Sequence, residues 1–254
     1  MFKLGIVTYN IAKDWDLETI IKKCSELSYE GVELRTSHAH KVEVNLSEEE
    51  RKEVKKKFAD SPVKLVGLGS AFEYHSPDKE ELKKNIEGTK EYIKLASDVG
   101  AEGVKVRPNA FPKEVSKEKT IEQIGLSLKE VSSFGADYGI KIRLEVHGKE
   151  TCHPPYIKKM LDVANHPNLY ACWNSNMADL DENGSLESNF NLLKEKIGLV
   201  HINELWNEYP WKKCFSLLED SGYAGFCLAE ISANPESERF LRYYKALFNA
   251  YNSH

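Results

Sequence analysis

Apolar and ionisable residues alternate along residues 139–148, which lie between two glycines. One face of a strand here would carry Ile140, Ile142, Leu144 and Val146. The other face would carry Lys141, Arg143, Glu145 and His147. A parallel strand covered by helices is normally apolar on both faces, and four ionisable side chains cannot all be buried without partners. The pattern therefore predicts a strand that ends in a polar, partly hydrated cavity.

Three other short segments show the same alternation, at residues 31–35, 103–107 and 199–203. Their polar faces carry Glu33 and Arg35, Lys105 and Arg107, and His201 and Asn203. Parallel strands that all direct polar side chains the same way line a common space. We therefore expect one shared polar site at the ends of these strands.

Short apolar segments alternate with segments of helical periodicity along the chain. Strands are predicted at residues 3–8, 31–35, 64–69, 103–107, 139–148, 169–173, 199–203 and 225–230. Helices are predicted at residues 16–27, 47–59, 77–99, 120–138, 155–165, 186–197, 210–221 and 235–251; a capping box from Ser47 to Glu50 opens the second. This alternation predicts a single-domain α/β fold, a (β/α)8 TIM barrel over residues 1–254. A doubly wound open sheet is the alternative, but no glycine-rich phosphate turn follows the first strand.

Charge and cysteine content narrow the setting in which the protein works. A formal net charge of -5 offers no basic surface for nucleic acid. The five cysteines are irregularly spaced and form neither a disulfide framework nor a Cys-x-x-Cys pair, which favours a reducing compartment. The residues before the first strand show no charged segment, long apolar run or cleavage site, so we expect no leader, and no stretch approaches the roughly 18 apolar residues of a membrane span. We expect a cytoplasmic protein with no nucleic-acid or membrane partner.

Six segments at predicted strand ends carry a family resemblance, at residues 29–35, 104–107, 144–147, 172–174, 201–204 and 222–230. In this order, the chain resembles the xylose-isomerase-like barrels, a superfamily of sugar and sugar-phosphate isomerases and epimerases. The resemblance covers essentially the whole length. It implies one divalent cation at the barrel rim, held by Glu145, Asn174, His201 and Glu230. Asn174 stands where the family has aspartate, so this site has one negative charge fewer.

The implied ligands suit a hard or borderline cation. Oxygen ligands favour Mg²⁺ or Mn²⁺, and one imidazole also admits Zn²⁺ or Co²⁺. The resemblance further implies that Glu145 and Glu230 form a general acid/base pair. The alternative interpretation makes both glutamates ion-pair partners of barrel arginines. Glu230 shares its strand face with the apolar Phe226 and Leu228, so alternation alone does not place it in the site.

Substrate binding is predicted for His147, Arg35, Arg107, Trp173, Asn176 and Glu204. His147 could instead support a ligating carboxylate. The two arginines could clamp a phosphate or carboxylate, or neutralise barrel glutamates. Trp173 and Trp206 could stack against the face of a sugar ring or pack in the core.

The predicted function is a divalent-metal-dependent isomerase or epimerase of a small-molecule sugar or sugar phosphate, working by proton transfer through an enediolate. The sequence does not decide whether the protein is a monomer or a homodimer. One alternative is a metal-dependent hydrolase or lyase, as in the apurinic endonucleases that share this barrel. Such an enzyme needs further histidines around several metal ions and a basic surface along which DNA binds. The alternative is retained because the chain carries His38, His40, His75 and His153. The other alternative, motivated by Asn174, is a barrel that binds a sugar without converting it.

Overall fold

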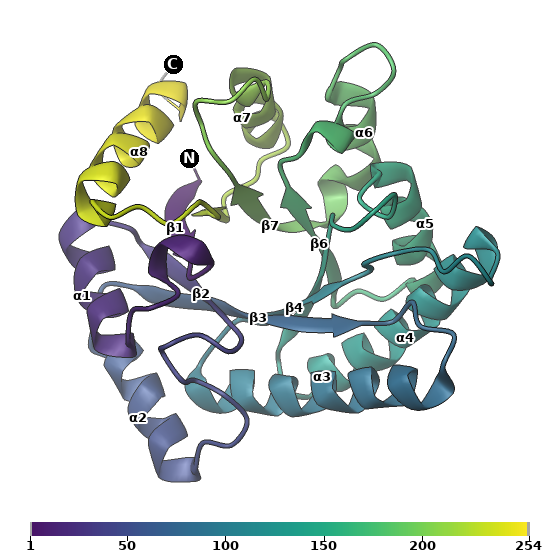
Figure 1. Ribbon diagram of the computed structural model, residues 1–254, viewed down its shortest axis with the longest axis horizontal. Helices are drawn as coiled ribbons and strands as arrows, with labels where there is room; N and C mark the ends of the chain where they lie inside the picture. Colours follow the sequence, from purple (N-terminus) through teal and green to yellow (C-terminus); the bar gives the residue numbers. More distant parts are fainter. Residues whose placement is uncertain (1, 253–254) are drawn as a thin grey trace.

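A computed structural model describes residues 2–252 of the protein, and within them eight parallel strands alternate with eight α-helices (Figure 1). The strands are β1 (Lys3–Val7), β2 (Gly31–Arg35), β3 (Lys64–Glu73), β4 (Gly103–Arg107), β5 (Lys141–Glu145), β6 (Leu169–Asn174), β7 (Ile197–Ile202) and β8 (Phe226–Ala229). They pair in sequential order, and β1 also pairs with β8, which closes the barrel. The predicted (β/α)8 barrel is confirmed, and the open sheet is excluded.

The helices form a layer around the strands in Figure 1. They are α1 (Leu17–Leu27), α2 (Glu48–Ala59), α3 (Lys79–Val99), α4 (Lys117–Asp137), α5 (Pro154–Ala164), α6 (Glu187–Leu193), α7 (Trp211–Asp220) and α8 (Ser237–Asn252). Short 3₁₀ turns η1 (Asn10–Ala12), η2 (Met177–Asp179) and η3 (Lys194–Lys196) complete the regular structure. None of the helices in residues 2–252 is long and apolar enough to cross a membrane.

Local sequence signals explain where several helices begin and end. The Asp16 carboxylate accepts a hydrogen bond from the Thr19 amide at 2.8 Å and starts α1. The predicted capping box is present, because Ser47 and Glu50 satisfy each other's backbone amides at the start of α2. Gly100 ends α3 with φ +79°, a left-handed conformation that favours glycine.

Two predicted boundaries differ from the structure by four residues, more than any other boundary. β3 continues to Glu73, four residues past the predicted end, because Glu73 pairs with Arg107 of β4 after a register shift. The predicted sixth helix reached residue 197, but α6 ends at Leu193 and Ile197 begins β7 by pairing with Ala171 of β6. Strand pairing therefore overrides the helical periodicity at this junction.

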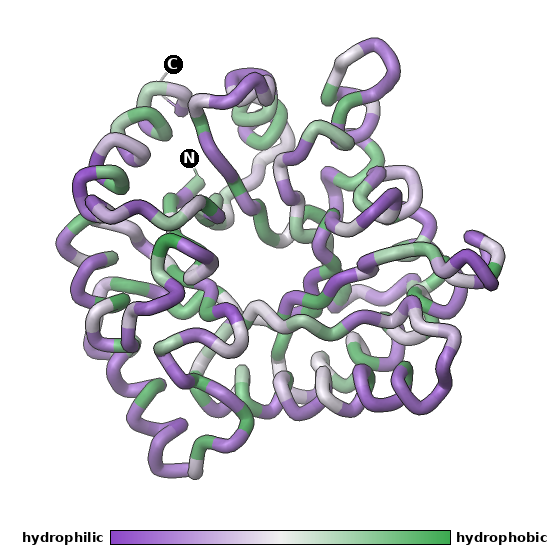
Figure 2. The backbone as a smooth tube through the Cα atoms, viewed as in Figure 1, coloured by the Kyte–Doolittle hydropathy of each residue, from purple (hydrophilic) through white to green (hydrophobic). Residues whose placement is uncertain are grey.

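The strands bury two separate apolar clusters. The larger one lies between the strands and the helices, and in Figure 2 the helix turns that face solvent are largely hydrophilic. The smaller one is contributed by strand residues Val7, Val66, Cys172, Leu199, Phe226 and Leu228. Glu230 alternates with Phe226 and Leu228, so its side chain shares their face of β8. This face is the barrel interior.

Arg143 occupies the interior below the strand ends. Its side chain is 2 % exposed, and Nη1 donates a hydrogen bond to the Val66 carbonyl at 2.8 Å. A Cβ at Gly67 would lie 2.9 Å from this nitrogen, so glycine makes room for the guanidinium. Lys141, on the same face of β5, is exposed, with its ammonium 5.7 Å from the Tyr170 ring. Along the polar face of β5, Lys141 is therefore exposed to solvent, Arg143 is buried in the barrel interior and Glu145 lines the cavity.

Candidate functional site

A polar cavity of about 300 Å³ opens at the carboxyl ends of the strands. Its lining residues are Tyr9, Arg35, Lys105, Arg107, Glu145, His147, Asn174, Asn176, Asn203 and Glu230. They come from β1, β2 and β4 to β8 or the segments directly after these strands. The shared polar space expected from the strand alternation is therefore present at this rim.

An ion pair lies at the base of the cavity. Lys105 donates from Nζ to Glu145 Oε2 at 2.7 Å, and Asn174 donates from Nδ2 to Glu145 Oε1 at 3.2 Å. Burial raises the pKa of Glu145, but the Lys105 charge and His201 outweigh this and hold the pKa well below its usual value. The arginines considered as partners of Glu145 do not fill this role, because Lys105 does.

The imidazole of His201 connects three carboxylates inside the barrel. Nδ1 lies 3.5 Å from Glu145 Oε1 and 3.5 Å from Glu230 Oε2. Nε2 lies 3.4 Å from Glu33 Oε1. His201 and Glu33 are both 0 % exposed, and no hydrogen-bond partner is found for either ring nitrogen within residues 2–252.

The donor atoms of this cluster fit one divalent cation. Ligand atoms from Glu145, His201 and Glu230 all lie within 4.8 Å of one another. Two carboxylates and one imidazole suit the metals named above. With Glu33 included, three carboxylates face the single ammonium of Lys105, so a dication would neutralise the remaining negative charge. Asn174 lies beside Glu145, and its part in metal binding stays a prediction.

Six of the predicted substrate-binding or metal positions line the cavity without belonging to the buried ion pair: Arg35, Arg107, His147, Asn174, Asn176 and Glu230. The Arg35 guanidinium lies 4.9 Å from the Tyr9 ring centroid, and no acidic partner for it occurs in the described chain. Arg107, in contrast, contacts Glu73 through Nη2. Arg35 is therefore the lining cation that remains free for a substrate group.

Two predicted substrate contacts lie outside the cavity. Trp173 is 0 % exposed, its ring centroid is 5.5 Å from that of Phe190 in α6, and Nε1 donates to Tyr209 Oη at 3.1 Å. Glu204 accepts a hydrogen bond from Trp206 Nε1 at 3.2 Å, and the Trp206 side chain is largely exposed. The structure gives Trp173 the core-packing role that the sequence left open.

The loop histidines have local partners. His40 Nε2 lies 2.8 Å from the Arg35 carbonyl, and His38 Nδ1 lies 3.2 Å from Thr8 Oγ1. His75 Nδ1 is 3.6 Å from Glu73 Oε2. Within the described residues, the group of His, Cys, Asp and Glu side chains suited to a metal is Glu145, His201 and Glu230, and no second group accompanies it.

Four residues of the site were given no role from the sequence: Tyr9, Glu33, Lys105 and Asn203. The alternation had placed Glu33, Lys105 and Asn203 on polar strand faces, so the signal was present. It did not say which of these side chains would be ligands, counterions or substrate contacts.

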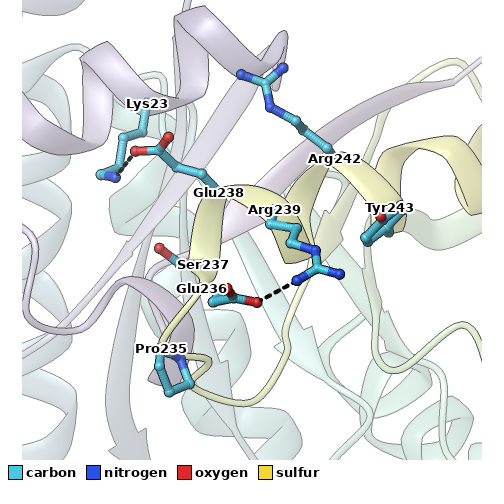
Figure 3. Close-up of a pocket in the computed structure, with 8 residues that line it drawn as sticks. All are labelled: Lys23, Pro235, Glu236, Ser237, Glu238, Arg239, Arg242 and Tyr243. Carbon is cyan, nitrogen blue, oxygen red and sulfur yellow. Dashed lines mark hydrogen bonds and ion pairs between the residues drawn. The ribbon is translucent and has the colours of Figure 1, made fainter.

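A larger depression of about 590 Å³ lies on the outer surface, between α1 and the start of α8 (Figure 3). Two ion pairs form here, Lys23 with Glu238 and Arg239 with Glu236, and Arg242 also lines the depression. None of its lining residues belongs to a barrel strand.

The fold and the site define a parallel β/α barrel with side chains at its rim that are suited to bind a metal ion. Sequence comparison gives its family. The model of the xylose isomerase-like TIM barrel family matches residues 21–247, so the chain belongs to that family. A comparison with curated proteins finds no match.

Solved structures of the same fold cover almost the whole chain. The IolI protein with a bound zinc atom is 18% identical, with 99% of this chain and 98% of that chain covered and a TM-score of 0.84. The 3-keto-D-glucoside 4-epimerase YcjR from E. coli is 14% identical, with 98% and 100% covered and a TM-score of 0.82. D-psicose 3-epimerase from Clostridium cellulolyticum H10, with D-tagatose, is 16% identical, with 97% and 91% covered and a TM-score of 0.78.

Proposed function

We propose that the protein is an isomerase or epimerase of a small sugar or sugar phosphate, acting by proton transfer at a carbon next to a carbonyl group. One observation carries the proposal: Glu145 and Glu230, from different strands, both lie 3.5 Å from the same nitrogen of His201 at the base of a polar cavity. When two carboxylates face the same small space, one can remove a proton from a bound carbon and the other can return a proton to it from another side.

The two glutamates have different surroundings, which suggests how they share the work. Glu145 is held by Lys105 and Asn174 and stays ionised. The Glu230 carboxylate accepts no hydrogen bond within the described residues, so it is the freer of the two to take a proton. One glutamate would remove the proton from carbon, and the electron pair left behind would form the carbon–carbon double bond of the enediolate. The other would return a proton.

Glu145, His201 and Glu230 would hold the divalent cation, which supplies Lewis-acid stabilisation of the substrate's negative oxygen. We favour Mn²⁺ or Mg²⁺, with Zn²⁺ or Co²⁺ as alternatives, and the zinc named for IolI supports a metal in this kind of site. The chain's own polar groups would orient the substrate. His147 and Asn176 face the cavity as hydroxyl partners, and Arg35 would receive a hydroxyl or an anionic group.

The activities of two neighbouring structures support the substrate class. They are epimerases of a 3-keto-glucoside and of psicose, and each of these sugars has a carbonyl beside a carbon that can exchange its hydrogen. The same chemistry suits the convergent glutamates of this chain.

Hydrogen exchange into a panel of sugars tests the proposal. The protein is incubated in deuterated water with ketoses and keto sugars, both free and phosphorylated, and deuterium at carbon is followed by proton NMR beside metal analysis. We expect exchange with at least one sugar, and none with a Glu230→Gln variant. Glu236→Gln, on the outer surface in Figure 3, is the matched control. A sugar that binds but exchanges no hydrogen would favour the non-catalytic sugar-binding barrel.

A further inference from the structure

Glu33 is a carboxylate buried in the barrel interior on β2. It is 0 % exposed, and neither Oε1 nor Oε2 has a hydrogen-bond partner within residues 2–252. A buried carboxylate without a partner is strongly unfavourable, so its presence calls for a physical reason. It does not line the cavity, which rules out direct contact with a substrate there.

The nearest group that could compensate the negative charge of Glu33 is the imidazole of His201. Nε2 lies 3.4 Å from Glu33 Oε1, slightly longer than a usual hydrogen bond. The opposite ring nitrogen, Nδ1, lies 3.5 Å from both Glu145 and Glu230. The ring therefore presents one nitrogen to the candidate metal ligands and the other to Glu33.

The backbone of β3 makes space for this carboxylate. A Cβ on Gly69 would lie 2.7 Å from Glu33 Oε1, closer than real Cβ contacts allow. The pairing of β2 with β3 also shifts register between Val32 and Glu33. Since any side chain at position 69 would displace the carboxylate, the position beside His201 depends on glycine there.

The geometry pairs an acceptor with a ring nitrogen, because His201 Nε2 faces Glu33 Oε1 while Nδ1 faces the other two carboxylates. An ionised carboxylate is an acceptor only, so it can receive the Nε2–H of His201 but cannot donate to it.

We propose that Glu33 is a positioning residue that accepts the Nε2–H of His201 and so leaves the Nδ1 lone pair directed at Glu145 and Glu230 for a divalent cation. The inference rests on the metal site of the proposed function. A histidine ligand commonly donates its other ring N–H to a carboxylate, which fixes the tautomer and ring orientation and makes the ligand more basic. In this chain, β2 supplies the carboxylate and β7 supplies the histidine.

Metal binding tests the proposal without any sugar. Calorimetric titration of Mn²⁺ into the metal-stripped full chain is compared for wild type, Glu33→Leu and Glu33→Gln. We expect Glu33→Leu to weaken Mn²⁺ binding about 10–100-fold. Glu33→Gln keeps a neutral acceptor and should fall between the two. The matched control is Glu43→Gln, a glutamate after the same strand that accepts hydrogen bonds from Thr36 and lies outside the cavity.

A second readout separates positioning from general loss of structure. Nitrogen-15 NMR of the Zn²⁺-loaded protein, which is diamagnetic, should show His201 protonated at Nε2 in wild type and a mixture of ring forms in Glu33→Leu. Adding Glu33→Leu to His201→Gln should weaken Mn²⁺ binding no further, because the positioned ring is already gone. If Glu33→Leu does not fold, Gly69→Ala displaces the same carboxylate without removing it and should weaken binding in the same direction.

Two results would overturn the inference: wild-type Mn²⁺ affinity with an unchanged His201 tautomer in folded Glu33→Leu, or failure of the wild type to bind Mn²⁺. Intact Mn²⁺ binding that depends on Glu33, in a protein that exchanges hydrogen with no sugar, would instead contradict the proposed function and leave the role of Glu33 standing.

Discussion

Lys105 and Glu145 form an ion pair at 2.7 Å inside the barrel, and their side chains are only 3 % and 2 % exposed. Two charges at this depth lose most of their hydration, and each depends on the other for compensation. The folding stability of the barrel therefore depends on the same ion pair that holds the candidate catalytic residue Glu145 in place.

Replacing Lys105 by methionine should destabilise the fold by about 3–5 kcal/mol, because the Glu145 carboxylate would be left buried and unpaired. Urea unfolding measures the change. Lys141→Met is the matched control: this lysine is exposed at the start of β5, and its loss should cost less than about 0.5 kcal/mol. Equal stabilities for the two variants would contradict the prediction.

Asn174→Asp should tighten divalent-metal binding, because hard cations bind anionic oxygen ligands more strongly than neutral ones. Calorimetry with Mn²⁺ compares the two forms. Asn203→Asp also adds a carboxylate to the lining of the cavity, but Asn203 is engaged with the Ser175 carbonyl. A gain in affinity at position 174 that exceeds the gain at 203 would place residue 174 among the ligands; unchanged affinity would remove it from them.

Glu145→Gln and Glu230→Gln should each reduce hydrogen exchange into a confirmed substrate by about 10²–10⁴-fold, since glutamine keeps the side-chain volume but cannot act as the base. Metal content and circular dichroism are measured on the same samples. The decisive variant is one that keeps both and loses exchange. Near-normal exchange in both variants would show that the paired-glutamate mechanism is wrong.

The pH dependence of stability should contain a contribution from Asp179, which lies behind the cavity on η2. Burial raises its pKa to about 8 from an ordinary value of 3.8, although the Tyr209 hydroxyl and the Asn176 amide donate hydrogen bonds that oppose the rise. Between these two pH values the folded state keeps a proton that the unfolded state has lost. Raising the pH through this window therefore favours unfolding, by up to about 1.4 kcal/mol per pH unit.

Asp179→Asn should flatten this part of the pH profile, because an amide does not titrate. Urea unfolding of both proteins at several values between pH 5 and pH 8 gives the difference directly. Parallel profiles for wild type and variant would mean that Asp179 is ionised in the folded protein throughout the range.

The barrel could be predicted because its signals are local. Each strand is short and apolar, and cap residues such as Asp16, Ser47 and Gly100 mark helix ends within a few positions. The two largest boundary errors occur where pairing with another strand decides the outcome. Glu73 joins β3 through its contact with β4, and Ile197 joins β7 through β6. Periodicity within one segment carries no information about either contact.

The polar strand faces indicated which residues point inward, but not their partners. The period of two that places Asn174 in the cavity also directs Trp173 to the opposite face, so its burial against Phe190 follows from the same rule. The choice of Lys105 over an arginine as partner of Glu145 does not follow from any pattern along the chain. It depends on which side chain of the neighbouring strand β4 reaches Glu145, and Arg107 contacts Glu73 instead, a property that appears only in three dimensions.

Closure between β1 and β8 joins the first strand of the chain to the last. A polypeptide that stopped before β8, through a premature stop codon or proteolysis, would leave β1 and β7 each with a row of unpaired backbone amides and carbonyls. Such rows are templates for pairing between chains. Shortened products of this gene should therefore accumulate as aggregates rather than as smaller folded proteins, and during synthesis the growing chain carries that hazard until its final strand has been made.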